Sequence, residues 1–234
     1  MQTNTDAEIV DWVGRIGAAG TQHIQARFQM GRSWAYHRLN QLTHDGLLEQ
    51  RQLLHRQPGL YTATAEGLRW RGLQRLGVER ISPGSFEHVW EVATVAVQLH
   101  QCLPGLTLLS DREIRDHETE RGELVASARL GELPGGRAAL HRPDLALVSN
   151  GGRVVSVEVE LSVKAARRLQ AICRGWARAR HVHHVYYLAT PAAAKAVSRA
   201  VQQSRAGDRI TVLPLQEVDG LLAAETREAS SGRL

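Results

Sequence analysis

The chain of 234 residues has little cysteine and no long apolar run, and each shortage excludes a class of protein. Its two cysteines, Cys102 and Cys173, are too few for a disulfide framework or a four-cysteine zinc site. No stretch approaches the ~18 uninterrupted apolar residues of a membrane span. Residues 1–11 lack the basic and then apolar pattern of a secretory signal. We therefore expect a cytoplasmic protein with no membrane segment.

Lysine is also scarce. The chain has 29 basic and 24 acidic residues, a net charge of +5, yet its only lysines are Lys164 and Lys195. Arginine offers a planar set of donors that suits phosphates and guanine edges, although heavy arginine use is also what a GC-rich genome produces. No glycine-rich phosphate loop and no serine nucleophile elbow is present. The charge balance permits nucleic-acid binding without establishing it.

Proline, glycine and serine gather in residues 77–85, which read as a boundary because they offer little to bury. We predict a mixed α and β protein with a first domain over 1–80, a second over 85–215 and a flexible tail over 216–234. Residues 111–140 are polar and glycine-rich, and their pattern assigns no element.

The first domain reads as three helices followed by two strands. Apolar spacing and turn residues predict helices over 7–18, 22–28 and 33–45, strands over 47–54 and 60–64, and a further helix over 65–75. Three helices and a two-stranded hairpin form the winged helix-turn-helix arrangement, and residues 6–75 resemble that superfamily. The resemblance rests on Gly20-Thr21-Gln22-His23-Ile24, on residues 32–42 and on Asp45-Gly46-Leu47-Leu48.

The third helix has the periodicity of a DNA-reading helix. Ala35, Leu39 and Leu42 fall at i, i+4 and i+7 and should pack inward. The side chains left for base edges in the major groove are Arg32, Ser33, Trp34, Tyr36, His37 and Gln41. Arg38 points sideways, towards a phosphate, and Arg51 and Arg56 would place the wing on the DNA backbone or minor groove. The alternative is a winged helix that binds only proteins, with Trp34 and Tyr36 as interface or core aromatics.

A second set of residues lies in the strands predicted over 144–149 and 153–161, which the turn Asn150-Gly151 joins. Alternation places Glu158 and Glu160 on one face, and a hairpin partner brings Asp144 beside them. Three carboxylates on one surface need a cation, hydrogen bonds or arginines as compensation. Mg²⁺ prefers such oxygen ligands and is the metal with which nucleases activate water.

Residues 85–213 resemble the PD-(D/E)XK nuclease fold, an αβββαβ core, through Pro143-Asp144 and the glutamate strand that follows it. The resemblance implies that Asp144 and Glu158 hold the metal and that a lysine orients the water. Glu87 or Glu91, on the leading helix, would match the extra acid of some members. The lysine position holds Glu160, and Lys164 lies four residues further on. Either Asp144, Glu158, Glu160 and Lys164 form the catalytic set of a Mg²⁺-dependent endonuclease, or the fold persists with an inactive site whose glutamates Arg167 and Arg168 neutralise.

Residues 163–180 contain six basic side chains and no acid: Lys164, Arg167, Arg168, Arg174, Arg178 and Arg180. Arg167, Arg174 and Arg178 fall at i, i+7 and i+11 of a predicted helix over 162–179, close to one face. Such a stripe suits a phosphate backbone, and it is equally what a solvated helix face that offsets the glutamates presents. The nearby His181, His183 and His184 lack the partners of a tetrahedral metal site.

The whole layout is similar to the replication-relaxation family of plasmid and mobile-element proteins. That resemblance implies a DNA-associated protein in transcription or in plasmid and mobile-element replication control. We predict a protein that binds double-stranded DNA through its winged helix, works as a homodimer and carries a catalytically degenerate nuclease-like domain. The alternative is the Mg²⁺-dependent endonuclease.

Overall fold

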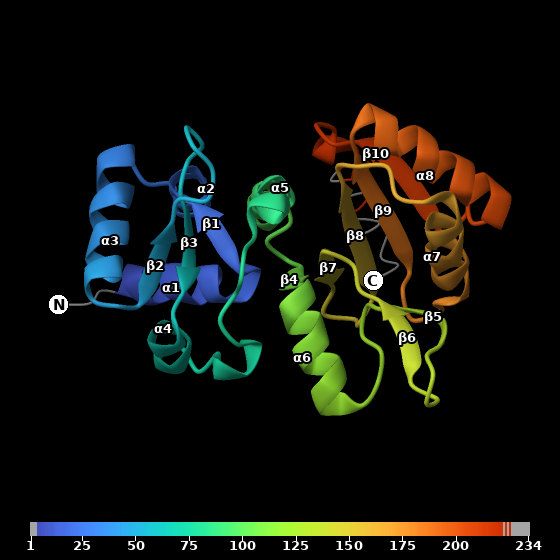
Figure 1. Ribbon diagram of the computed structural model, residues 1–234, viewed down its shortest axis with the longest axis horizontal. Coiled ribbons are helices and arrows are strands. Elements are labelled where there is room, and N and C mark those ends of the chain that lie inside the picture. Colours follow the sequence, from blue (N-terminus) through green and yellow to red (C-terminus); the bar gives the residue numbers. More distant parts are fainter. Residues whose placement is uncertain (1–3, 222, 224, 226–234) are drawn as a thin grey trace. The chain divides into compact units, whose positions relative to one another are not determined.

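The computed structural model describes residues 4–221, 223 and 225, and it is of mixed α and β class, as predicted (Figure 1). The chain divides into two compact units between Gln101 and Cys102. No helix in the described residues is both long and apolar enough to cross a membrane.

The first unit has the winged helix-turn-helix order of elements, and its three strands form one antiparallel sheet in the order β1-β3-β2 (Figure 1). Its elements are α1 (Asn4–Ile16), β1 (Ala18–Gly20), α2 (Thr21–Phe28), α3 (Arg32–His44), β2 (Leu48–Arg51), β3 (Leu60–Ala63), α4 (Ala65–Trp70), the short 3₁₀ helices Gln74–Leu76 and Pro83–Ser85, and α5 (Phe86–Cys102). The sequence predicted every α-helix of this unit and two of its three strands.

Strand β1 was not predicted, because three residues carry too little alternation to stand out. Gly20 ends this strand and is the N-cap of α2. A Cβ at Gly20 would lie 2.5 Å from the ring of Trp90, so only glycine lets α5 approach this closely. The close packing of α5 on β1 therefore depends on the absence of one side chain.

Helix α5 belongs to the first unit, whereas the sequence placed it at the start of the second domain. Phe86 is buried in one cluster with Ala18 and Leu60, and its ring stacks on Trp90 with 5.7 Å between centroids. The Gln101 side chain donates to the Ala26 carbonyl at 2.5 Å. The amphipathic pattern shows that α5 packs on something, but it does not show on what.

His23 links α2 to α5 through a buried chain of hydrogen bonds. Its Nδ1 accepts from the Gly20 amide at 2.9 Å, so Nε2 carries the proton and donates to Thr94 Oγ1 at 3.0 Å. That hydroxyl donates in turn to the Trp90 carbonyl at 3.1 Å. Burial lowers the pKa of His23 from 6.5 to about 4. The folded unit therefore holds a neutral imidazole.

Acid should destabilise the first unit through His23. The unfolded chain binds this proton near pH 6.5 and the folded chain only near pH 4, so stability is lost as the pH falls through that window. We expect His23 to account for a loss of about 2 kcal/mol between about pH 7.5 and pH 5. Urea unfolding of His23→Gln should show a smaller loss over that range. The exposed control His44→Gln should behave as the wild type does, and a His23→Gln protein as acid-sensitive as the wild type would contradict the assignment.

The second unit is built on a five-stranded sheet in the order β10-β9-β8-β7-β4, with β7 antiparallel to both neighbours and β8, β9 and β10 parallel. Its elements are β4 (Thr107–Ser110), α6 (Asp111–Arg121), β5 (Ala128–Glu132), β6 (Ala138–His141), β7 (Leu145–Val148), β8 (Val154–Glu160), α7 (Ala166–Arg178), β9 (His184–Ala189), α8 (Pro191–Ser204) and β10 (Ile210–Pro214). The βββαβ part of the predicted order is present in this unit as β4, β7, β8, α7 and β9, whereas the predicted leading helix, α5, lies in the first unit. Helix α6 and the hairpin β5–β6 occupy the stretch that the sequence left unassigned.

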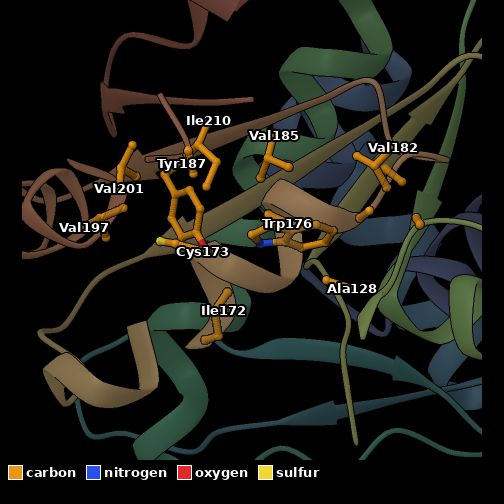
Figure 2. Packing of buried hydrophobic residues seen from close by; sticks show 14 of the residues in the cluster. Ala128, Ile172, Cys173, Trp176, Val182, Val185, Tyr187, Val197, Val201 and Ile210 are labelled. Atoms are coloured by element: carbon orange, nitrogen blue, oxygen red, sulfur yellow. The ribbon is translucent and has the colours of Figure 1, made fainter. Parts of the chain in front are cut away.

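Helices α7 and α8 lie side by side over one face of this sheet (Figure 1). Figure 2 shows the core between them, where Trp176 and Cys173 of α7 meet Tyr187 of β9 and Val197 of α8. Burial raises the pKa of the Cys173 thiol to about 11, so this cysteine is a protonated core residue. Helix α7 begins at Ala166 rather than 162, which leaves Lys164 in the loop before it.

The expected flexible tail is wrong for residues 216–221. Val218 and Leu221 are buried, because apolar side chains three residues apart fall on one face of a helical turn. Glu225 is buried as well, pairs with Arg153 at 2.5 Å and accepts from the Tyr186 hydroxyl at 3.2 Å. Residues 226–234 lie outside the described residues.

Candidate functional sites

Helix α3 presents the face that its periodicity predicts. Ala35, Leu39 and Leu42 are fully buried. The six side chains predicted for base contacts are all exposed: Arg32, Ser33, Trp34, Tyr36, His37 and Gln41. The three apolar side chains hold the helix on the unit, and the polar face that is left exposed belongs to an α-helix, which the DNA major groove is wide enough to admit.

Two large aromatic rings stand on this face, with Trp34 46% and Tyr36 39% exposed. Exposure excludes the alternative that they are core residues and leaves open that they are interface residues. The guanidinium of Arg32 lies 5.6 Å from the Tyr36 ring centre, a cation–π distance that orients both side chains. Gln41 donates to Asp45 at 3.0 Å, a surface contact that a ligand can replace.

Arg38, which was predicted to contact a phosphate, is paired with an acid inside the first unit. Its Nε donates to Asp6 Oδ1 at 2.7 Å, and its Nη2 pairs with Asp6 Oδ2. Asp6 is fully buried and the Arg38 side chain is only 12% exposed. The guanidinium therefore links α3 to α1. The side chain that was expected to point sideways, towards a phosphate, points into the unit instead.

The wing lies between β2 and β3. Arg56 at its tip is exposed and has a positive φ of 63°, which a turn requires, and the adjacent His55 is exposed too. Arg51 is half-buried and donates to Glu49 at 2.8 Å. Arg56 is therefore the better placed of the two predicted wing arginines for contact with a ligand.

The acidic residues of the second unit come together as predicted. Leu145 of β7 lies opposite Val157 of β8, so Asp144, one residue before β7, lies beside Glu158. Asp144 Oδ2 accepts from the Val159 amide at 2.7 Å. Glu158 lies opposite Tyr187 of β9, which packs in the core with Cys173 of α7, so its side chain is on the α7 face of the sheet.

Each buried glutamate has its own cationic or donor partner. Glu158 is 3% exposed, and its Oε1 lies 2.6 Å from His141 Nε2. Glu160 is 4% exposed, and its Oε2 lies 2.5 Å from Lys164 Nζ. His141 and Lys164 therefore supply the compensation expected of Arg167 and Arg168, which are exposed.

These contacts do not fit a Mg²⁺ site. One oxygen of each carboxylate already contacts a partner within the protein, in Asp144, Glu158 and Glu160 alike. Among the described residues, no group of three or more His, Cys, Asp or Glu side chains is placed to hold a metal. Glu87 and Glu91 of α5 lie in the first unit. The arrangement is a buried ionic cluster rather than an open set of metal ligands.

His141 is the member of this cluster that sequence reasoning missed. It ends β6 and its ring meets Trp176 edge-on, 5.7 Å between centroids. Burial lowers its pKa, but the charge and the hydrogen bond of Glu158 outweigh burial, and the net shift is upward. The charge of Lys164 lowers this pKa and that of Asp144 raises it. The sequence offered one indication that His141 joins the cluster, namely its position two residues before Pro143-Asp144.

Alkali should weaken the second unit through His141. Because its folded pKa lies above the ordinary 6.5, its stabilising charge is present below pH 6.5 and is lost as the pH rises through the folded pKa. We expect wild-type unfolding free energy to fall over that range and His141→Gln to show a flatter dependence. Urea unfolding followed by tryptophan fluorescence measures both. Parallel pH profiles for the two proteins would show that the imidazolium does not stabilise the fold.

The basic stripe of α7 is at the surface. Arg167, Arg174 and Arg178 are all exposed, as the spacing predicted. The neighbouring histidines have structural partners: His181 Nε2 donates to the Ser127 carbonyl at 2.9 Å, and His184 bonds Thr211 at 2.8 Å. These contacts give His181 and His184 structural roles within the second unit.

No family model matches the chain, and no curated protein matches it. Among solved structures, it is similar to protein VC1899 from Vibrio cholerae, with 11% identity, a TM-score of 0.34, and coverage of 97% of this chain and 57% of that one. It is also similar to PigF, solved with SAH, at 15% identity and a TM-score of 0.20, covering 90% of this chain and 61% of that one. The chain thus spans less than two thirds of each neighbour. At these values neither likeness assigns a function.

Proposed function

We propose that this protein binds double-stranded DNA, with α3 in the major groove and the tip of the wing on the backbone. The observation that carries the proposal is the face of α3. Three apolar side chains anchor it, and Arg32, His37 and Gln41 project from it with donors and acceptors for base edges. Trp34 and Tyr36 add flat surfaces beside these polar groups.

In this proposal the acidic cluster of the second unit is not catalytic. The Val159 amide and His141 form hydrogen bonds with Asp144 and Glu158, and Lys164 pairs with the charge of Glu160, so each carboxylate has a partner within the protein. The exposed arginines of α7 add sequence-independent contacts with phosphates. We further propose a homodimer that acts in transcription or in plasmid and mobile-element replication control, the role that the resemblance to the replication-relaxation family implies.

The test is a selection of genomic duplex fragments by the intact chain at low salt. We expect one or a few sequences to be enriched and to bind at least about 10³-fold more tightly than scrambled duplexes. Affinity should fall steeply as salt rises, because bound phosphates release counterions. Light scattering of the complex gives the number of chains on each site. Recovery of no sequence above background would exclude specific DNA reading.

The endonuclease alternative has its own test, which is incubation of plasmid and of the selected duplex with Mg²⁺ or Mn²⁺. We expect no cleavage above that of an Asp144→Ala control prepared in the same way. Cleavage that disappears in Asp144→Ala and in Glu158→Gln would instead make the acidic cluster a nuclease site.

A further inference from the structure

The second unit contains a pocket that includes Arg178, the last arginine of the exposed α7 stripe, but neither Arg167 nor Arg174. It has a volume of about 450 Å³ and lies where the C-terminal part of α7 meets strand β5. Its lining residues are Leu124, Arg129, Gly131, Gly175, Arg178, Ala179 and His181. This volume is in the range of pockets that bind small molecules.

The inner wall of the pocket is formed by small residues, and glycine there lets α7 pack closely against β5. Gly175 is buried in α7, and a Cβ there would lie 2.8 Å from the Leu130 side chain and 3.2 Å from the Arg129 carbonyl. The buried part of the lining, Gly175 and Ala179, is therefore small and apolar. Such a surface accepts a flat ring more readily than it accepts a polar group.

The exposed part of the lining is basic. Arg129 comes from β5 and Arg178 from α7, and both side chains are exposed. Within the part of the chain that the structure describes, neither guanidinium has a carboxylate partner, and no acid lines the pocket. His181 completes the rim, fixed by its hydrogen bond to the Ser127 carbonyl. Two arginines without acidic partners favour an anion, and a phosphate accepts their donors in pairs.

We propose that this pocket binds a phosphorylated small molecule of nucleotide size, with its phosphates between Arg129 and Arg178 and its ring against Gly175 and Ala179. A duplex backbone is the less favoured source of the phosphate, because Arg167 and Arg174, the other arginines of the α7 stripe, lie outside the pocket. The proposal does not depend on DNA binding by the first unit. It gives the second unit a ligand in place of a catalytic reaction.

Titration calorimetry of the intact chain with ADP, GDP, pyrophosphate and adenosine tests it. We expect at least one nucleoside diphosphate to bind about tenfold more tightly than adenosine, and Arg129→Ala/Arg178→Ala to weaken that binding by about tenfold or more, the effect of losing charge-assisted hydrogen bonds. The control Arg167→Ala/Arg174→Ala removes the same charge from α7 outside the pocket and should leave the affinity within about twofold. Thermal melting confirms that both variants fold.

Three results would overturn the assignment. The first is that neither nucleotide nor pyrophosphate binds at millimolar concentration. The second is an equal loss in the two double variants, which would reduce the effect to net charge. The third is that Arg129→Ala/Arg178→Ala weakens binding of the selected duplex while the wild type binds no nucleotide, which would assign the pocket to the DNA backbone.

Discussion

Arg38→Ala is expected to lower the free energy of unfolding of the first unit by about 3 kcal/mol, because it leaves the buried carboxylate of Asp6 without its cation. Asp6 lies in the first turn of α1 and Arg38 in the middle of α3, so the pair fastens the DNA-reading helix to the rest of the unit. The melting temperature of this unit should fall by roughly 10–20 °C. Urea unfolding by circular dichroism measures the loss.

The matched control for this variant is Arg15→Ala, which removes an arginine from the surface pair with Asp11. Its side chain is 46% exposed, and we expect a loss below about 0.5 kcal/mol. The double variant Asp6→Ala/Arg38→Ala should lose less than the sum of the two single variants, since it removes the stranded charge together with its partner. An Arg38→Ala protein as stable as Arg15→Ala would place Arg38 back among the side chains available for DNA.

Arg32→Ala/Gln41→Ala is expected to weaken binding to the selected duplex by roughly 100-fold or more, at about 1–3 kcal/mol for each lost base contact. Binding to a scrambled duplex should change far less, because base contacts carry the discrimination and phosphate contacts do not. Fluorescence anisotropy with both duplexes, at one stated salt concentration, gives the two ratios. The stability of the unit should be unchanged, since both side chains are exposed.

The control for that experiment exchanges the same residue types elsewhere in the first unit. Arg69 of α4 and Gln74 after it are exposed and lie outside α3 and the wing. Arg69→Ala/Gln74→Ala should retain the affinity of the wild type within about twofold. If the two double variants lose affinity equally, the effect is one of charge on the unit as a whole, and α3 has no special part in reading the sequence.

The sequence was most informative where a side chain's place depends on its own element. Periodicity alone identified the buried face of α3, and alternation with a tight turn brought Asp144 to Glu158. These predictions need only the 3.6-residue and two-residue repeats and one hairpin register. The arginine stripe of α7 emerged at the surface for the same reason.

The sequence was least informative where the partner lies far along the chain. Arg38 reads as a surface arginine until Asp6, 32 residues away, is seen to be its partner. Helix α5 reads as the start of a new domain until Gly20 is seen to make room for Trp90. His141 joins the acidic cluster across a sheet boundary, at a separation of 17 residues from Glu158. Contacts of this kind follow from tertiary packing, which no local repeat encodes.

Hydrogen exchange of the intact chain, measured with and without the selected duplex, tests the central claim most directly. We predict that the duplex slows exchange in peptides that cover α3 and the wing tip around Arg56, while peptides of α1 and α4 exchange as before. Protection confined to the second unit, or absent from α3 at saturating duplex, would contradict the claim that this helix meets DNA.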